Sequence, residues 1–254
     1  MADRRIRVMV TPSPSHPPIL RAGSPPADPV FTVLVLHGGK VRSVAPTRSW
    51  QLSVLRMWPF TRALRRTFPQ AAVYSLQYRL RGWNGADRSP VRDARWALEQ
   101  IRERHGDIPV VLVGHSMGGR TAAAVADEPS VVGVMALAPW WPEGTETVTL
   151  RPGQRLRVAH GTADSWTDPK LSRRATDLAG HRGVDAEWIP MARAGHFMLM
   201  RPRRWTRQVL GFVAETVADH TPNAAEEFAA EGFAAEGFAA EGFAAEGFAA
   251  EELR

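Results

Sequence analysis

Valine-rich apolar runs alternate with segments of helical period along residues 1–222. Each run is apolar at successive positions, which is typical of strands buried on both faces of a parallel sheet. The segments between the runs are long enough for the helices that connect parallel strands. We therefore expect a doubly wound, mostly parallel α/β sheet of about seven strands with helices on both faces. The predicted strands are Ile6–Val10, Val30–His37, Ala71–Tyr78, Val110–Gly114, Val131–Ala138, Leu156–His160 and Ala186–Pro190.

Helix start signals and apolar stripes predict several covering helices. Ser89-Pro90 has the pattern of an N-cap followed by the first helical residue, and Asp168-Pro169 repeats that signal. An alanine-rich helix is expected over residues 120–127. The last helix is predicted over residues 202–219, and its apolar residues share one face, which should cover the sheet. These residues are Trp205, Val209, Phe212, Val213 and Val217.

From Ala224 onward the chain repeats a five-residue unit, AAEGF. A period of five advances each phenylalanine by about 140° around a helix, so no face gathers them. Each glycine of the repeat costs about 1 kcal/mol relative to alanine in a helix. We therefore expect residues 1–222 to form the α/β domain and residues 223–254 to be a flexible low-complexity tail. The alternative is an acidic, phenylalanine-bearing segment that binds a partner or folds back on the basic body.

The composition excludes several chemistries. The 254 residues include no cysteine, which rules out disulfides, thiolate zinc sites, iron–sulfur clusters and a cysteine nucleophile. No histidine pair has the H-E-x-x-H spacing of a zinc hydrolase, so we expect neither a metal nor another cofactor. No apolar run approaches the ~20 residues of a membrane-spanning helix, and a cytoplasmic protein is therefore the expectation.

The net charge of +6 conceals two parts of opposite sign, +13 over residues 1–222 and −7 over residues 223–254. A basic body can indicate a nucleic-acid partner. Here all but two of the basic residues are arginine, and they are scattered without interleaved aromatic side chains. We therefore expect solvated arginines and no nucleic-acid binding; the pattern does not indicate an oligomeric state.

The strongest chemical signal is G-H-S-M-G at residues 114–118, between a predicted strand and a predicted helix. The G-x-S-x-G pattern alone is weak, but this setting is that of a nucleophile elbow. A sharp turn there would raise the Ser116 hydroxyl above the sheet edge. Positions 114 and 118 are expected to require glycine, because a Cβ on either residue would collide across the turn. Capping of the helix by Ser116 is the alternative.

A serine hydroxyl is a poor nucleophile unless a base takes its proton and a carboxylate orients that base. An aspartate and a histidine should therefore follow Ser116 along the chain. Asp164 comes after the strand that ends at His160, and His196 comes after the next strand. Both positions lie at the carboxyl ends of strands, where sites on such sheets are built.

Four motifs in one order resemble the α/β-hydrolase family over residues 30–220: LHGG at 36–39, GHSMGG at 114–119, HGTAD at 160–164 and AGH at 194–196. The resemblance implies Ser116 as nucleophile, Asp164 as the acid and His196 as the general base. It also implies an oxyanion hole made by the N–H groups of Met117 and Gly39.

Other residues compete for the two remaining roles. Asp168 could serve as the acid in a differently folded loop, although capping the helix explains it adequately. His115 points off the elbow in members of the family. For His37 and His160 we expect packed, hydrogen-bonded roles at strand ends. His105 and His181 lie near predicted helix ends, where solvent or the helix dipole is a sufficient explanation.

Only residues 140–155 separate two of the predicted strands, so a large lid cannot fit there and the site should be open. An open site suits small or accessible esters. Trp140, Trp141 and Trp166 could line an acyl pocket or pack in the core. Lys40 could attract an anionic substrate, and an exposed lysine without that role is the alternative.

These observations predict a cofactor-free serine hydrolase that cleaves a small-molecule carboxylic ester or related acyl compound through an acyl-enzyme on Ser116. A thioesterase or acyltransferase with the same three residues is the nearest alternative, since fold alone does not decide function. A non-catalytic, hydrolase-like binding protein is the alternative from another class.

Overall fold

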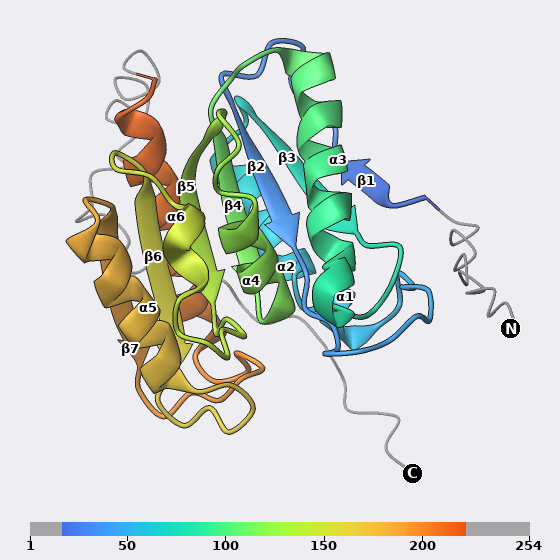
Figure 1. Cartoon of the computed structure of the whole chain (residues 1–254). Coiled ribbons are helices and arrows are strands. Elements are labelled where there is room, and N and C mark those ends of the chain that lie inside the picture. The colour runs from blue at the N-terminus through green and yellow to red at the C-terminus, as the bar shows by residue number, and fades with distance from the viewer. Residues whose placement is uncertain (1–16, 222–254) are drawn as a thin grey trace, which may run out of the picture.

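Seven strands form one sheet in the computed structural model, which describes residues 17–221 (Figure 1). The sheet order is β1-β3-β2-β4-β5-β6-β7, and every neighbouring pair is parallel except β1 with β3. The doubly wound, mostly parallel sheet expected from the sequence is confirmed. The strands are β1 (Ile19–Ala22), β2 (Phe31–Leu36), β3 (Ala71–Gln77), β4 (Val110–His115), β5 (Val131–Leu137), β6 (Arg155–Gly161) and β7 (Asp185–Met191).

The strand expected at Ile6–Val10 and the repeat from Ala224 onward both lie outside the described residues. The seventh strand is instead β1, which forms an antiparallel edge. The apolar pattern does not reveal β1 because the strand has four residues, most of them exposed. The other six predicted strands are confirmed to within two residues at each end.

Helices cover both faces of the sheet, as predicted. In Figure 1, α3 (Ser89–His105), α4 (Met117–Ala124) and α5 (Pro169–His181) lie in front of the sheet, whereas α2 (Trp58–Thr67) and α6 (Pro202–Ala218) lie behind it. The short helix α1 (Leu52–Leu55) and the 3₁₀ turns η1 (Gly85–Asp87) and η2 (Glu146–Thr149) lie in connections.

Side-chain alternation along the strands divides the buried residues into two cores. All six residues of β2 are buried; Phe31, Val33 and Val35 pack with α2 and α6, and Leu34 and Leu36 pack with α3 and α4. A strand buried on both sides favours apolar residues at nearly every position, and in β2 only Thr32 is polar, which explains the continuous apolar runs.

The five apolar residues that define the predicted face of α6 are all buried, and α6 contacts β4, β5 and β6. The last helix therefore covers the sheet as expected. None of the helices in residues 17–221 is long and apolar enough to cross a membrane.

Of the two helix starts predicted from a proline at the first helical position, one agrees with the sequence pattern and one differs. Asp168 caps α5 as predicted, since its Oδ1 accepts the Lys170 N–H at 2.8 Å. Ser89, however, is the first helical residue of α3 rather than its cap; Arg88 holds the cap position, and Ser89 Oγ accepts a hydrogen bond from Asn84 Nδ2 at 3.2 Å.

The elbow helix α4 covers residues 117–124 rather than 120–127, because the Ser116 carbonyl already accepts the N–H groups of Gly119 at 3.0 Å and Arg120 at 3.2 Å. Helical hydrogen bonding therefore starts directly after Ser116.

The topology brings the candidate residues to one edge of the sheet. From β2 the chain proceeds to β3 on one side, whereas β4 pairs with the other side of β2. The carboxyl ends of β2 and β4 therefore meet where the strand order reverses, which is where ligands bind on open α/β sheets. Between β5 and β6 the chain forms only loops and the four-residue η2, so the minimal lid is also confirmed.

Candidate active site

Ser116 occupies a strained turn between β4 and α4. Its φ of 55° and ψ of −117° lie in a region that residues other than glycine rarely adopt. The Ser116 N–H donates to Leu137 O at 3.0 Å, and its carbonyl accepts the Trp140 N–H at 3.1 Å. These bonds to β5 and the segment after it hold the strained conformation in place.

The two glycines of the elbow are required by the close approach of backbone segments. A Cβ on Gly114 would collide with the carbonyl of Gly118 and would lie 2.7 Å from Gly119 N. A Cβ on Gly118 would collide with Leu36 O at the end of β2. The expected reason for these glycines is confirmed.

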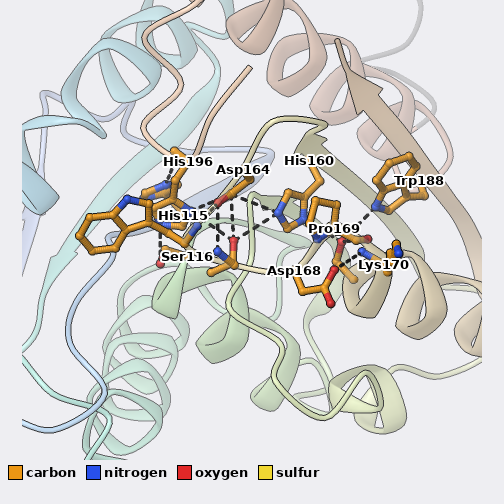
Figure 2. Close-up of polar contacts among 12 residues, drawn as sticks. His115, Ser116, His160, Asp164, Asp168, Pro169, Lys170, Trp188 and His196 are labelled. Atoms are coloured by element: carbon orange, nitrogen blue, oxygen red, sulfur yellow. Dashed lines mark hydrogen bonds and ion pairs between the residues drawn. The ribbon is translucent and has the colours of Figure 1, made fainter. Parts of the chain in front are cut away.

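Three side chains from three loops form a continuous hydrogen-bonded chain (Figure 2). Ser116 Oγ lies 3.1 Å from His196 Nε2, and His196 Nδ1 lies 2.9 Å from Asp164 Oδ2. Asp164 follows β6 and His196 follows β7, so each stands at the carboxyl edge of the sheet. The structure thus brings together the three residues singled out in the sequence.

The Asp164 carboxylate has no exposed surface and is surrounded by donors. Its Oδ1 accepts the N–H groups of Trp166 at 2.8 Å and Thr167 at 3.0 Å, and its Oδ2 accepts the Thr167 hydroxyl at 2.9 Å. Burial raises the pKa of Asp164, but hydrogen bonds from His160, His196 and the two backbone N–H groups outweigh burial and hold that pKa well below its usual range. The carboxylate is therefore ionised.

The two residues expected to supply the oxyanion donors are close to each other. Met117 is the first residue of α4, where a backbone N–H has no acceptor within the helix. Gly39 lies against the Met117 side chain, since a Cβ on Gly39 would lie 2.7 Å from Met117 Sδ. The loop after β2 thus approaches the start of α4 at the point where Ser116 stands.

Two further histidines hold these loops in place. His115 Nε2 contacts His196 O at 3.0 Å, which makes that nitrogen the donor. His37 Nδ1 donates to Gly38 O at 2.6 Å, and its Nε2 accepts the Tyr78 N–H at 3.4 Å. Burial lowers the pKa of His115 to about 3 and that of His37 to about 4, so both are neutral near pH 7 and neither faces Ser116 as a base.

The remaining competitors are placed elsewhere. His105 Nε2 bonds to Tyr74 OH at 2.8 Å, and His181 Nδ1 donates to Asp177 O at 2.7 Å. Asp168 is committed to capping α5. Within residues 17–221, no group of three or more histidine or acidic residues could hold a metal ion.

Sequence reasoning missed two neighbours of the acid, His160 and Thr167. The packed, hydrogen-bonded role expected for His160 is found, but its partner was not foreseen: Nε2 lies 3.2 Å from Asp164 Oδ2. The available signal was the HGTAD motif itself, which places a histidine four residues before the acid across a tight turn. Thr167 carries no such signal, because its contact depends on the turn that returns the chain to Asp164.

The three tryptophans have different positions. Trp141 is 2% exposed and belongs to the core, and Trp140 packs edge-on against Trp83 at 6.1 Å. Trp166 is 71% exposed and stacks on His196 with ring centroids 6.2 Å apart. Of the three, Trp166 is therefore the one that borders the site. Lys40 is exposed, in agreement with the simpler interpretation of that residue.

Comparison with solved structures finds the same fold in several hydrolases. An α/β serine hydrolase without a lid from Xanthomonas campestris is 18% identical (TM-score 0.59; 76% of this chain and 86% of that chain covered). The esterase Est2 of Thermogutta terrifontis is 18% identical (TM-score 0.58; 80% and 87% covered). Est1E from Butyrivibrio proteoclasticus, solved with ferulic acid bound, is 12% identical (TM-score 0.58; 79% and 96% covered). At sequence identities this low, the structural similarity establishes a shared fold alone.

The sequence itself provides the assignment to a family. No curated protein sequence matches the chain significantly. A sequence model described as the alpha/beta hydrolase family matches residues 33–242, which is most of the chain. The match includes the loop after β2, the elbow and the loops that carry Asp164 and His196. The chain therefore belongs to the α/β-hydrolase family.

Proposed function

We propose that the chain is a serine hydrolase that cleaves a carboxylic ester, or a related acyl compound, through an acyl-enzyme on Ser116. The observation that carries this proposal is the unbroken series of hydrogen bonds from Ser116 Oγ through both nitrogens of His196 to Asp164 Oδ2. Nucleophile, base and orienting acid within this reach are the requirement for acyl transfer by a serine.

The ionised carboxylate determines which nitrogen of His196 carries the proton. Asp164 Oδ2 can only accept, so Nδ1 of His196 donates to it and Nε2 is left as an acceptor facing Ser116. As Ser116 Oγ attacks the substrate carbonyl carbon, Nε2 takes the hydroxyl proton. Asp164 then stabilises the imidazolium that forms.

The developing negative charge falls on the carbonyl oxygen of the substrate. The N–H groups of Met117 and Gly39 donate to this oxyanion, and the N-terminal end of α4 favours charge there. His196 returns its proton to the leaving alkoxide as the carbon–oxygen bond breaks. Water, deprotonated by His196, then attacks the acyl-enzyme, releasing the acid and restoring Ser116.

An accessible ester is the favoured substrate class. The connection between β5 and β6 carries no large insertion that would cover Ser116, and the exposed Trp166 beside His196 offers an aromatic contact at the edge of the site. Esterases among the proteins of similar fold support the same class.

Replacement of Ser116 tests the proposal. We expect Ser116→Ala to lose at least about 10³-fold in hydrolysis of p-nitrophenyl acetate and butyrate, while its melting temperature stays near that of the wild type. A fluorophosphonate should label the wild type at Ser116 and fail to label the variant.

The matched control is Ser130→Ala, because Ser130 directly precedes β5 at the amino edge of the sheet, opposite the site. This variant should hydrolyse and be labelled like the wild type. A Ser116→Ala protein that retains wild-type hydrolysis would refute the proposal, and so would a folded wild type that is neither labelled nor active on any ester tested.

A further inference from the structure

His160 lies beneath the proposed catalytic residues and contacts a polar group with each of its ring nitrogens (Figure 2). It is the second-last residue of β6, pairs with Pro190 of β7 and is 0% exposed. The mechanism above does not use it. A buried histidine between two defined partners requires an account of which nitrogen carries the hydrogen.

The Nδ1 side faces Ser172, whose Oγ lies 2.7 Å away. Trp188 Nε1 donates to the same Oγ at 3.0 Å, and an indole N–H can only donate. The single hydroxyl hydrogen of Ser172 then has two acceptors within reach, His160 Nδ1 and Pro169 O at 3.0 Å. Because a carbonyl oxygen can accept two hydrogen bonds and a hydroxyl oxygen can accept two, these contacts allow either the Ser172 hydroxyl or an Nδ1–H of His160 to be the donor in the 2.7 Å contact.

The Nε2 side decides which nitrogen of His160 carries the hydrogen. Nε2 lies 3.2 Å from Asp164 Oδ2 and 3.2 Å from Thr167 Oγ1. The side chains of His160 and Asp164 have no exposed surface. An unprotonated Nε2 would direct its lone pair at an ionised oxygen without water to separate them, which is unfavourable. Nε2 therefore carries the hydrogen.

We propose that His160 is a positioning residue for Asp164, and this inference rests on the proposed function. Its Nε2–H, fixed from behind by Ser172 and Trp188, holds Oδ2 in line with Nδ1 of His196 and keeps the carboxylate ionised although no water reaches it. The carboxylate is thus shared between two histidines, of which only His196 faces Ser116.

Sharing the carboxylate also tunes the base. A hydrogen bond from His160 withdraws negative charge from Oδ2, so Asp164 stabilises the His196 imidazolium less than it otherwise would. The other titratable groups nearby are His115, whose ring lies 4.9 Å from that of His196, and Arg56, which acts on His115 through its charge. Loss of the His160 donor should therefore strengthen the interaction of Asp164 with the protonated form of His196.

Two substitutions at residue 160 separate positioning from packing. We expect His160→Leu to lower kcat/KM for p-nitrophenyl butyrate roughly 10- to 100-fold and to move the acid limb of its pH profile to higher pH. His160→Gln retains an N–H donor that reaches Oδ2, so it should remain within several-fold of the wild type with an unshifted limb. His181→Leu, at an exposed histidine in the last turn of α5, is the control and should change neither.

A readout independent of activity accompanies these measurements. The ¹⁵N resonances of His160 are assigned as those present in histidine-labelled wild-type protein and absent from His160→Gln. In the wild type their chemical shifts should be those of a protonated Nε2 and an unprotonated Nδ1. If His160→Leu does not fold, Ser172→Ala replaces it, since loss of the Ser172 donor should weaken the same tautomer and reduce kcat/KM.

The results distinguish failure of the inference about His160 from failure of the proposed function. The inference is overturned if His160 carries its hydrogen on Nδ1, if folded His160→Leu keeps wild-type kcat/KM and pH profile, or if His160→Gln is impaired as strongly as His160→Leu. An inactive, unlabelled wild type with the expected tautomer would instead overturn the proposed function while leaving the hydrogen-bond assignment intact.

Discussion

Gly39 shows how closely the loop after β2 approaches the elbow. A Cβ at this position would collide with the Met117 side chain and with Arg81 O, which is backbone and cannot rotate away. The adjacent Lys40 N–H donates to that same carbonyl at 2.8 Å. Any residue larger than glycine must therefore displace the loop that carries one of the two proposed oxyanion donors.

We expect Gly39→Ala to lower kcat/KM for short esters by roughly 10²-fold, because a displaced donor stabilises the oxyanion less. Most of the loss should appear in kcat, since the oxyanion forms only in the transition state. Steady-state kinetics with p-nitrophenyl acetate provide the measurement. Wild-type kcat in a folded variant would place the second donor elsewhere.

The elements differ in how far the sequence predicts them. The strands β2 to β6 are evident because each contains apolar residues that the sheet buries, and in β2, β4 and β5 nearly every position is buried. Helix α2 was not named among the expected helices, although Phe60, Leu64 and the flanking Phe68 stand at helical spacing and are buried; β1, with four mostly exposed residues, offers no such pattern. Short or partly exposed elements depend on tertiary contacts that a local pattern does not contain.

The candidate site follows the same rule. The positions of Ser116, Asp164 and His196 at the carboxyl edge could be predicted, since each follows a recognisable strand. The contacts of His160 and Thr167 with Asp164 could not, because they depend on the path of residues 161–167 after β6. A strand end can be predicted from periodicity, whereas the direction of a loop cannot.

Within α6, Gly211 lies in the middle of a 17-residue helix, and a Cβ there would meet no atom within 4 Å. Gly211→Ala should therefore stabilise the protein by up to about 1 kcal/mol, the difference between glycine and alanine in a helix. Urea denaturation measures this change, and ester hydrolysis should be unaffected. A less stable variant would contradict the open space found beside Gly211.

At the scale of the whole molecule, the sheet edge that carries the proposed catalytic residues also contains two buried neutral histidines. His37 is 3% exposed and His115 is 2% exposed, and their hydrogen bonds hold the oxyanion loop and the loop of His196. Burial opposes the charged form of both, whereas in the unfolded chain each titrates near its ordinary pKa of 6.5. Protonation therefore favours the unfolded chain.

The direction of the pH dependence follows from proton counting. Below pH 6.5 both histidines bind a proton in the unfolded chain. In the folded protein His37 remains neutral down to about pH 4 and His115 down to about pH 3. The free energy of unfolding should therefore decrease as pH falls from about 6.5 to 4, by about 1.4 kcal/mol per pH unit for each histidine. Asp164, whose pKa is lowered by folding, adds a further loss only below about pH 4.

Urea denaturation between pH 7 and pH 4 tests this prediction, with His115→Asn for comparison. The variant lacks one of the two imidazoles that become protonated on unfolding. Its free energy of unfolding should therefore fall with pH along a slope shallower by about 1.4 kcal/mol per pH unit, whatever its stability at pH 7. Parallel curves for the two proteins would show that His115 in the folded protein binds its proton at the same pH as in the unfolded chain, and so is protonated at the acid end of this range. In that case the bond from His115 to the loop of His196 would be made by an imidazolium.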